Sequence, residues 1–220
     1  MPHTLRRWTA GICLVVAPLV YVAGLLADPA LRAGDAAAGA YGRHPEQVSV
    51  SAALLHWSWV LLVPGIIGMV HLVRRRAVVA GHVAGGLALL GIVNFSALML
   101  GDFFYARLEN ALGAEEGARL GDAAWAMAGA RWGFQIPGFL GLLGVLALGL
   151  VLAFDRRVPW WAPPAMVAGM LTGPIYPIGM VVGSLLYIAG AGVIGVRLLR
   201  MSDAEWLQDP VPSGKVAATV

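Results

Sequence analysis

Hydrophobic residues along this chain fall into six long runs that short polar segments separate. Most of the runs contain about twenty residues or more, the length that an α-helix needs to cross a bilayer core of roughly 30 Å. The pattern therefore predicts an all-α fold, a polytopic membrane bundle of six transmembrane helices. The predicted spans cover about residues 9–27, 48–73, 77–101, 132–154, 158–173 and 177–196.

The fifth run is shorter than the others. It reaches only to Gly173 before the sequence Pro174-Ile175-Tyr176-Pro177. A helix of about sixteen residues is roughly 24 Å long, which is less than the thickness of the hydrocarbon core. We therefore expect this proline turn to lie below the outer membrane surface, where neighbouring helices shield its backbone from lipid.

Residues 105–130 form the longest connection on the expected outer side. Apolar residues recur there at helical spacing, while acidic residues occupy the other faces. This pattern predicts a short amphipathic segment of two helices, broken near Gly113, that lies along the outer surface. The segment either covers a site as a lid or serves as a plain connector.

The composition excludes a soluble globular protein. Hydrophobic residues make up 59% of the 220 residues and charged residues only 12%, against roughly 25% charged in soluble domains. The single cysteine, Cys13, excludes an intrachain disulfide and a thiol-redox pair.

The charges indicate the orientation in the membrane. With the N-terminus inside, the inner segments carry ten basic and four acidic residues, and the outer segments carry five basic and eight acidic residues. This bias matches the positive-inside rule. We expect both termini to be cytoplasmic in a multi-pass protein of the cytoplasmic (inner) membrane, with residues 1–201 as the bundle and 202–220 as a disordered tail. The basic charge then reports topology, so no nucleic-acid partner is predicted.

Polar side chains within the runs gather in the halves expected to face outward. Asp102, at the end of the third run, is either a carboxylate exposed to water at the interface or a partly desolvated proton donor. His56, in the second run, is either a hydrogen-bonded core histidine or the partner of Asp102 in proton transfer. We predict Asp102 and His56 as catalytic residues.

Further polar and aromatic side chains of the same region are predicted to contact a ligand. An apolar pocket with a few convergent polar groups is typical of a small-molecule site. The expected partners are the bilayer and an apolar or amphipathic molecule such as a lipid, an isoprenoid or a hydrophobic metabolite. For Asn94 the alternative is a hydrogen bond between helices. The predicted ligand-binding residues are Trp59, Asn94, Tyr105, Gln135 and Tyr176.

The histidines do not form a recognisable metal motif. His56 and His71 lie on one predicted helix about 22 Å apart along its axis, so they cannot share a metal ion. Neither an HExxH motif nor a cysteine cluster is present, and we predict no metal site and no cofactor. A haem held by His71 and His82 across the inner loop is the alternative. A GxSxG nucleophile motif is also absent.

The order of four short motifs resembles a known group of proteins. These are an outer HPEQ, a second run ending in LVRRR, a third run ending in GDFF, and VRLLRMSDAEW at the start of the tail. With these motifs the chain resembles a broad group of small actinobacterial multi-pass membrane proteins. The resemblance implies a membrane topology and carries no activity.

Two classes of function follow from these features. The first is a membrane enzyme that performs acid-initiated chemistry on an apolar substrate, such as isoprenoid cyclisation or isomerisation by a terpene cyclase-like lyase or isomerase. Asp102 would donate the proton, and aromatic faces would stabilise cationic charge. The alternative is a non-catalytic component, either a substrate-binding or transport subunit or a structural membrane subunit.

Overall fold

The computed structural model describes residues 3–33, 37–74, 77–175 and 177–207, and every regular element in these ranges is helical. Five stretches are long and apolar enough to cross a membrane. Three of them are single helices: α1 (His3–Ala27), α4 (Pro45–His71) and α11 (Ile178–Arg200). The stretch Val78–Leu112 consists of α5 (Val78–Leu98) and α6 (Leu100–Leu112). The stretch Ala128–Phe154 consists of α8 (Ala128–Ala130), the π-helical turn η2 (Arg131–Gln135) and α9 (Ile136–Phe154).

The fifth hydrophobic run forms a shorter helix than the other runs. The helix α10 covers Ala162–Thr172, eleven residues, which gives about 16 Å of helix. It begins after the aromatic pair Trp160-Trp161 and ends before Pro174. The described residues therefore contain five helical stretches of spanning length where the hydropathy pattern predicts six spans, because prolines confine α10.

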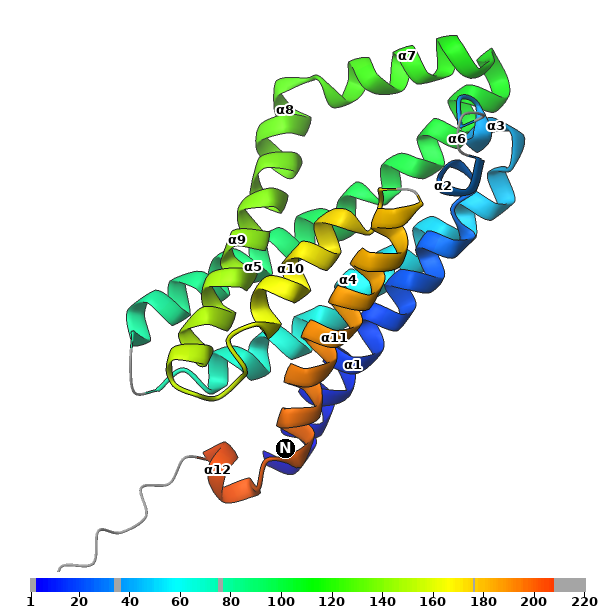
Figure 1. Cartoon of the computed structure of the whole chain (residues 1–220). Coiled ribbons are helices and arrows are strands. Elements are labelled where there is room, and N and C mark those ends of the chain that lie inside the picture. The colour runs from blue at the N-terminus through cyan, green and yellow to red at the C-terminus, as the bar shows by residue number, and fades with distance from the viewer. Residues whose placement is uncertain (1–2, 34–36, 75–76, 176, 208–220) are drawn as a thin grey trace, which may run out of the picture.

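Six helices form a closed ring in the order α1, α4, α5, α9, α10, α11, and each contacts the next around the ring (Figure 1). Close approaches between backbones hold neighbouring helices together. A Cβ atom added to Gly91 of α5 would collide with the backbone of Gly141 on α9. Small residues permit this kind of packing in membrane bundles, where lipid tails remove the hydrophobic drive between helices.

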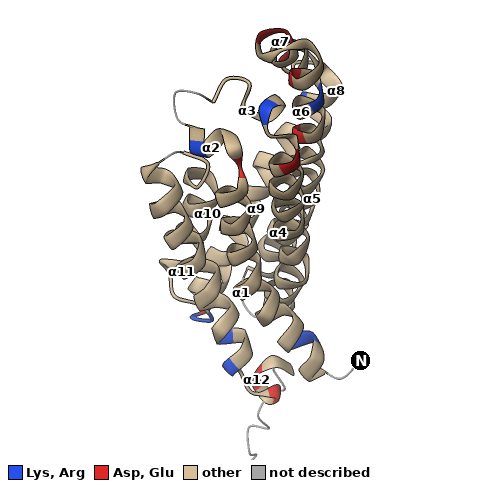
Figure 2. Ribbon diagram, turned by 90° about the vertical axis from the view of Figure 1, so that its right-hand side faces the viewer, with Lys and Arg blue, Asp and Glu red and all other residues tan. Residues whose placement is uncertain are grey.

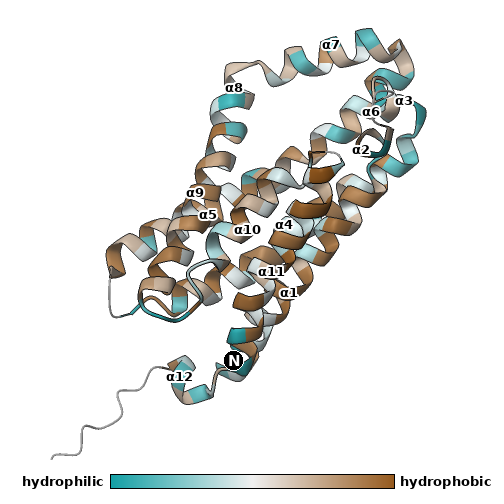
Figure 3. Cartoon of the chain, viewed as in Figure 1, coloured by the Kyte–Doolittle hydropathy of each residue, from teal (hydrophilic) through white to brown (hydrophobic). Residues whose placement is uncertain are grey.

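The bundle has two ends of different composition. Figure 3 shows hydrophobic residues along the helices of the ring and hydrophilic residues gathered at both ends. Acidic residues lie on α6 and α7 at one end, and basic residues lie on α1 and α11 at the other (Figure 2). We call these the α7 end and the α12 end.

Short helices cover the α7 end. They are α2 (Pro29–Ala33), α3 (Ala40–Arg43) and α7 (Ala114–Trp125), and α7 runs across this end of the bundle (Figure 1). The chain turns between α6 and α7 at Gly113, where φ is 88°. This left-handed conformation favours glycine, and the break falls at the position expected from the sequence.

A last short helix, α12 (Asp203–Leu207), packs on the opposite end. Ser202 and Glu205 form a capping box: the Ser202 N–H donates to Glu205 Oε2 at 2.8 Å, and the Glu205 N–H donates to Ser202 Oγ at 3.2 Å. Trp206 is buried at 2% exposure. The first residues of the expected tail are therefore helical, and the capping box and the buried Trp206 ring hold them on the bundle. Residues 208–220 lie outside the described residues.

Candidate functional site: a buried aromatic cluster

Aromatic rings from five helices of the ring contact one another in a line that runs from the surface of α9 into the bundle. Trp59 of α4 stacks on Phe95 of α5 with 4.8 Å between ring centroids, and Phe95 meets Phe139 of α9 edge to face at 5.4 Å. Tyr21 of α1 lies edge to face with Trp59 at 6.0 Å and with Tyr187 of α11 at 5.2 Å. We call these five residues the aromatic cluster. It forms a continuous line of ring contacts from α9 to α11.

Polar atoms at this cluster have hydrogen-bonding capacity that the described residues do not use. The Tyr21 hydroxyl donates to the Met170 carbonyl at 3.0 Å. By contrast, Trp59 Nε1 and the Tyr187 hydroxyl are buried without a partner in the described part of the chain, and so is Ser184 Oγ, three residues before Tyr187 on α11. Buried polar groups in proteins are almost always paired, and leaving one unpaired costs about 1–3 kcal/mol. These atoms therefore keep unused hydrogen-bonding capacity inside the bundle.

An apolar groove on the outer side of the ring of helices contains one member of the cluster. It lies between α9 and α10, has a volume of about 330 Å³ and is lined by seven apolar residues, among them Phe139, Leu143 and Leu171. Those three side chains are exposed. Phe139 belongs to both the α9–α10 groove and the aromatic cluster. A molecule dissolved in the membrane can thus contact the outermost ring of the cluster from the groove.

Asp102 lies in an acidic group at the α7 end. Burial raises the pKa of Tyr41 above its ordinary value, and the charges of Asp102, Asp28 and Glu109 raise it further. The Tyr41 hydroxyl donates to Asp28 Oδ2 at 3.1 Å. Burial also raises the pKa of Asp28, although the N–H groups of Ala30 and Leu31 and the Tyr41 hydroxyl oppose that rise. Asp102 is therefore a neighbour of Asp28 and Tyr41.

His56 has a different neighbour from the one that the sequence analysis predicts. Its Nδ1 lies 2.8 Å from Ser96 Oγ on α5 and 3.4 Å from the Ser96 carbonyl oxygen. Among the described residues, no hydrogen bond or ion pair joins His56 to Asp102. This geometry fits the alternative of a hydrogen-bonded histidine between two helices. The catalytic roles of Asp102 and His56 remain predictions.

The predicted ligand-binding residues lie in several places. Trp59 is a member of the aromatic cluster. Asn94 is buried, and its Nδ2 donates to the Leu90 carbonyl of the same helix at 2.8 Å. Tyr176 lies outside the described residues.

Two of the predicted ligand-binding residues, Tyr105 and Gln135, connect the bundle to α7. The Tyr105 hydroxyl donates to Asp122 Oδ1 at 2.6 Å, and Gln135 Nε2 donates to the Trp125 carbonyl at 3.1 Å. Gln135 ends the π-helical turn η2, and Pro137 follows two residues later in the first turn of α9. Proline lacks an N–H and displaces the preceding turn, so a π-helical turn is a reasonable local solution. Whether Tyr105 and Gln135 contact a ligand stays a prediction.

The segment across the α7 end encloses a further pocket. It lies between α6 and α7, has a volume of about 250 Å³, and its lining includes Tyr105, Leu108 and Trp125. Gly121 allows the Tyr105 ring to approach α7, and Gly101 does the same for Trp125. The amphipathic helices thus pack on α6 through their own aromatic contacts, which suits either a lid or a connector.

Three members of the aromatic cluster were not singled out by the sequence analysis: Tyr21, Phe139 and Tyr187. A signal for the two tyrosines was nevertheless present. Tyrosine in membrane proteins is enriched at the interfaces, where its hydroxyl reaches water. Tyr21 and Tyr187 instead lie inside hydrophobic runs, a placement that indicates an internal site for their hydroxyl groups.

Metal-binding side chains do not converge within the described ranges, where no group of three or more His, Cys, Asp or Glu residues could hold a metal ion. The two histidines of the haem alternative make separate contacts. His71 Nε2 lies 3.1 Å from the Trp206 carbonyl oxygen, and His82 Nδ1 lies 2.8 Å from the Val78 carbonyl oxygen of its own helix.

The chain matches no protein-family model, no curated protein and no solved structure. The site must therefore be interpreted from its own geometry. The helices of spanning length indicate a multi-pass membrane protein. Its helices hold the aromatic cluster between them.

Proposed function

We propose that this protein binds an apolar or amphipathic molecule inside the membrane. The molecule enters from the lipid through the α9–α10 groove and lies against the aromatic cluster. The observation that carries the proposal is the unbroken contact from Phe139 in the groove, through Phe95, to buried Trp59, whose Nε1 has no partner among the described residues. Flat rings supply apolar contact area, and one or two polar atoms fix the orientation of a ligand.

Two helices shape the surroundings of this line of contacts. Gly138 of α9 faces the Phe95 ring, and a Cβ atom there would lie 3.5 Å from it. The short α10 covers less of α9 than a helix of spanning length would. An apolar molecule therefore finds exposed aromatic surface at this side of the ring.

The topology belongs to the same proposal. We propose six crossings, with α10 and its flanking residues as the fifth, because α10 occupies a full position in the ring between α9 and α11. The α12 end would face the cytoplasm and the α7 end would face outward, since the basic residues of α1 and α11 gather at the α12 end. Labelling of single cysteines introduced in a Cys13→Ala background, on α7 and on α12, tests the orientation.

A pair of tryptophans on α4 provides the test of ligand binding. Trp59 is 5% exposed within the aromatic cluster, whereas Trp57, two residues away, is 57% exposed. The protein is extracted in a mild detergent, and native mass spectrometry measures the fraction of protein that carries a bound molecule. Trp59→Phe keeps an aromatic ring but removes Nε1, and Trp57→Phe is the matched control.

We expect Trp59→Phe to weaken binding by roughly two- to tenfold, the equivalent of one neutral hydrogen bond of about 0.5–1.5 kcal/mol. Trp57→Phe should bind as the wild type does. A wild-type protein without any bound molecule, or equal occupancy in the two variants, would reject the proposed site.

A second candidate function is the acid-initiated chemistry with Asp102 as proton donor. The specific observation in its favour is the neighbouring carboxyl of Asp28, because paired carboxyls in different surroundings often supply one acid and one base. Asp102 is not a member of the aromatic cluster, so binding without chemistry is the better-supported function. Asp102→Asn should abolish any product found in lipid extracts of membranes that contain the wild type. Unchanged product in that variant would refute the role of Asp102.

A further inference from the structure

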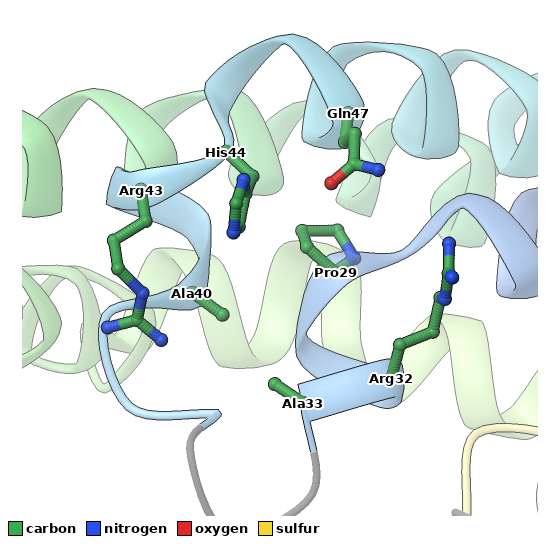
Figure 4. A pocket seen from close by; sticks show the side chains of 7 residues that line it. All are labelled: Pro29, Arg32, Ala33, Ala40, Arg43, His44 and Gln47. Atoms are coloured by element: carbon green, nitrogen blue, oxygen red, sulfur yellow. The ribbon is translucent and has the colours of Figure 1, made fainter.

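A polar pocket at the α7 end stands apart from the aromatic cluster. It lies between α2, α3 and the first turn of α4 and has a volume of about 290 Å³ (Figure 4). Arg32 and Arg43 flank it from opposite sides, and His44 and Gln47 point toward Pro29 between them. We call the site formed by Arg32, Arg43, His44 and Gln47 the basic pocket.

Among the described residues, neither Asp28 nor Glu46 pairs with Arg32 of this pocket, and Asp35 lies outside the described residues. Asp28 directs its carboxylate elsewhere: Oδ1 accepts from the Ala30 N–H at 2.8 Å, and Oδ2 accepts from the Tyr41 hydroxyl. Glu46 is not one of the lining residues. Within the described ranges, Arg32 forms no ion pair with a carboxylate. Arg32 therefore brings a positive charge to the lining that no carboxylate of the described residues pairs with.

The backbone holds part of this arrangement in place. Arg43 Nη1 donates to the Ala38 carbonyl at 2.9 Å, which fixes one guanidinium beside the pocket. Gly42, the preceding residue, is held on α6: its N–H donates to Glu109 Oε2 at 2.9 Å, and its carbonyl accepts from Asn110 Nδ2 at 2.9 Å. The short helix α3 therefore presents Arg43 and His44 from a fixed position.

The start of α4 adds the N–H groups of Glu46 and Gln47 near the same space, whereas Pro45 at the first position has no N–H group. His44 is the N-cap residue of this 27-residue helix and makes no side-chain capping bond. The N–H groups in the first turn of a helix lack acceptors within the helix, and the positive end of the helix dipole attracts anions. Gln47 lies in that turn and lines the pocket. Side-chain cations and a helix N-terminus thus converge on one volume.

The depth of the pocket suits the phosphate layer of a bilayer. The helix α1 ends at Ala27 and α4 begins at Pro45, and both are helices of spanning length. The pocket lies where these two helices meet the short helices α2 and α3. Phosphate groups of lipids lie at this level, just outside the hydrocarbon core.

We propose that the basic pocket binds a phosphate group, with Arg32 as its principal cation and His44, Gln47 and the first turn of α4 as further donors. Arginine suits this role because its planar fork of donors matches phosphate oxygens. The group can belong to a phospholipid headgroup or to a soluble phosphate anion, since both present the same oxygens. This proposal does not depend on the aromatic cluster.

The test uses the full chain in two settings. In a maltoside detergent, which contains no phosphate, calorimetry measures the binding of inorganic phosphate. In nanodiscs of phosphatidylcholine with added phosphatidylglycerol, native mass spectrometry counts the lipids that remain bound. The variant is Arg32→Gln. The matched control is Arg119→Gln, which removes the same charge from an exposed ion pair with Glu116 on α7.

We expect Arg32→Gln to weaken phosphate binding about tenfold or more, as the loss of one charge-assisted hydrogen bond implies. Arg119→Gln should keep wild-type affinity. Loss in both settings indicates a site open to soluble anions as well as lipids, and loss in the nanodisc alone identifies the lipid headgroup as the source. Absence of binding in both settings, wild-type affinity in Arg32→Gln, or an equal loss in Arg119→Gln would overturn the proposal. Because Arg32 is exposed, both variants should unfold at the temperature of the wild type.

Discussion

The contact between α5 and α9 makes a sharp prediction about stability. A Cβ atom at Gly91 would collide with the Gly141 Cα atom and would lie 2.8 Å from the Gly141 nitrogen and 2.9 Å from the Gly138 carbonyl oxygen. All three are backbone atoms of α9, which cannot rotate out of the way as a side chain can. Gly91→Ala therefore forces the two helices apart.

The size of the effect can be isolated with a control on the same helix. Gly86 of α5 has no atom within 4 Å of the position of an added Cβ. Because Gly91→Ala and Gly86→Ala change helix propensity by the same amount, their difference measures packing alone. Overpacking in a well-packed core costs about 1–3 kcal/mol, so Gly91→Ala should be less stable than Gly86→Ala by that amount.

Unfolding of the detergent-solubilised protein in increasing SDS, followed by tryptophan fluorescence, measures this difference. We expect Gly86→Ala to unfold at or above the wild-type SDS concentration and Gly91→Ala to unfold below it. If the two variants unfold together, α5 and α9 do not depend on a glycine contact, and the ring order described above loses its main support at this interface.

Three further predictions concern the ends of the bundle. Arg7→Met should lower the free energy of unfolding by about 1–3 kcal/mol, because buried Arg7 donates to two backbone carbonyls. Asp203→Asn should lower it by less than about 1 kcal/mol, because the Asp203 carboxylate is largely exposed. Thermal unfolding that ranks the two variants the other way would refute this prediction. Burial raises the pKa of Asp28, so the folded state binds the Asp28 proton more tightly than the unfolded state does, and the wild type should lose stability as the pH rises from about 4. Asp28→Asn should remove this pH dependence. An unchanged profile of unfolding temperature against pH in that variant would contradict the prediction. Trp206→Ala should release α12 and allow trypsin to cleave after Arg200, whereas resistance equal to that of the wild type would show that the buried ring does not hold the helix.

Hydropathy was sufficient to predict the class of fold and most of the helices. Several features determine the position and the ends of a helix without contacts between distant residues: runs of apolar residues, charge bias and Gly113. Such features can be recognised in the linear sequence. The same is true of α10, where Pro174 and Pro177 limit the length of the helix. The sequence analysis did not use the S-x-x-E pattern of Ser202 and Glu205, whose capping box explains why the tail begins as a helix.

The neighbours of each polar side chain required the tertiary structure. His56 and Asp102 both belong to the half of the bundle that carries α7, which made their pairing a reasonable expectation. In the structure, His56 meets Ser96, and Asp102 belongs with Asp28 and Tyr41. A hydrophobic run determines the depth of a residue in the membrane. It determines neither the rotation of the helix about its axis nor which other helix packs beside it. Those depend on which glycine faces meet between helices far apart in the sequence, as Gly91 and Gly141 do, and this packing is also what brings the five rings of the aromatic cluster together.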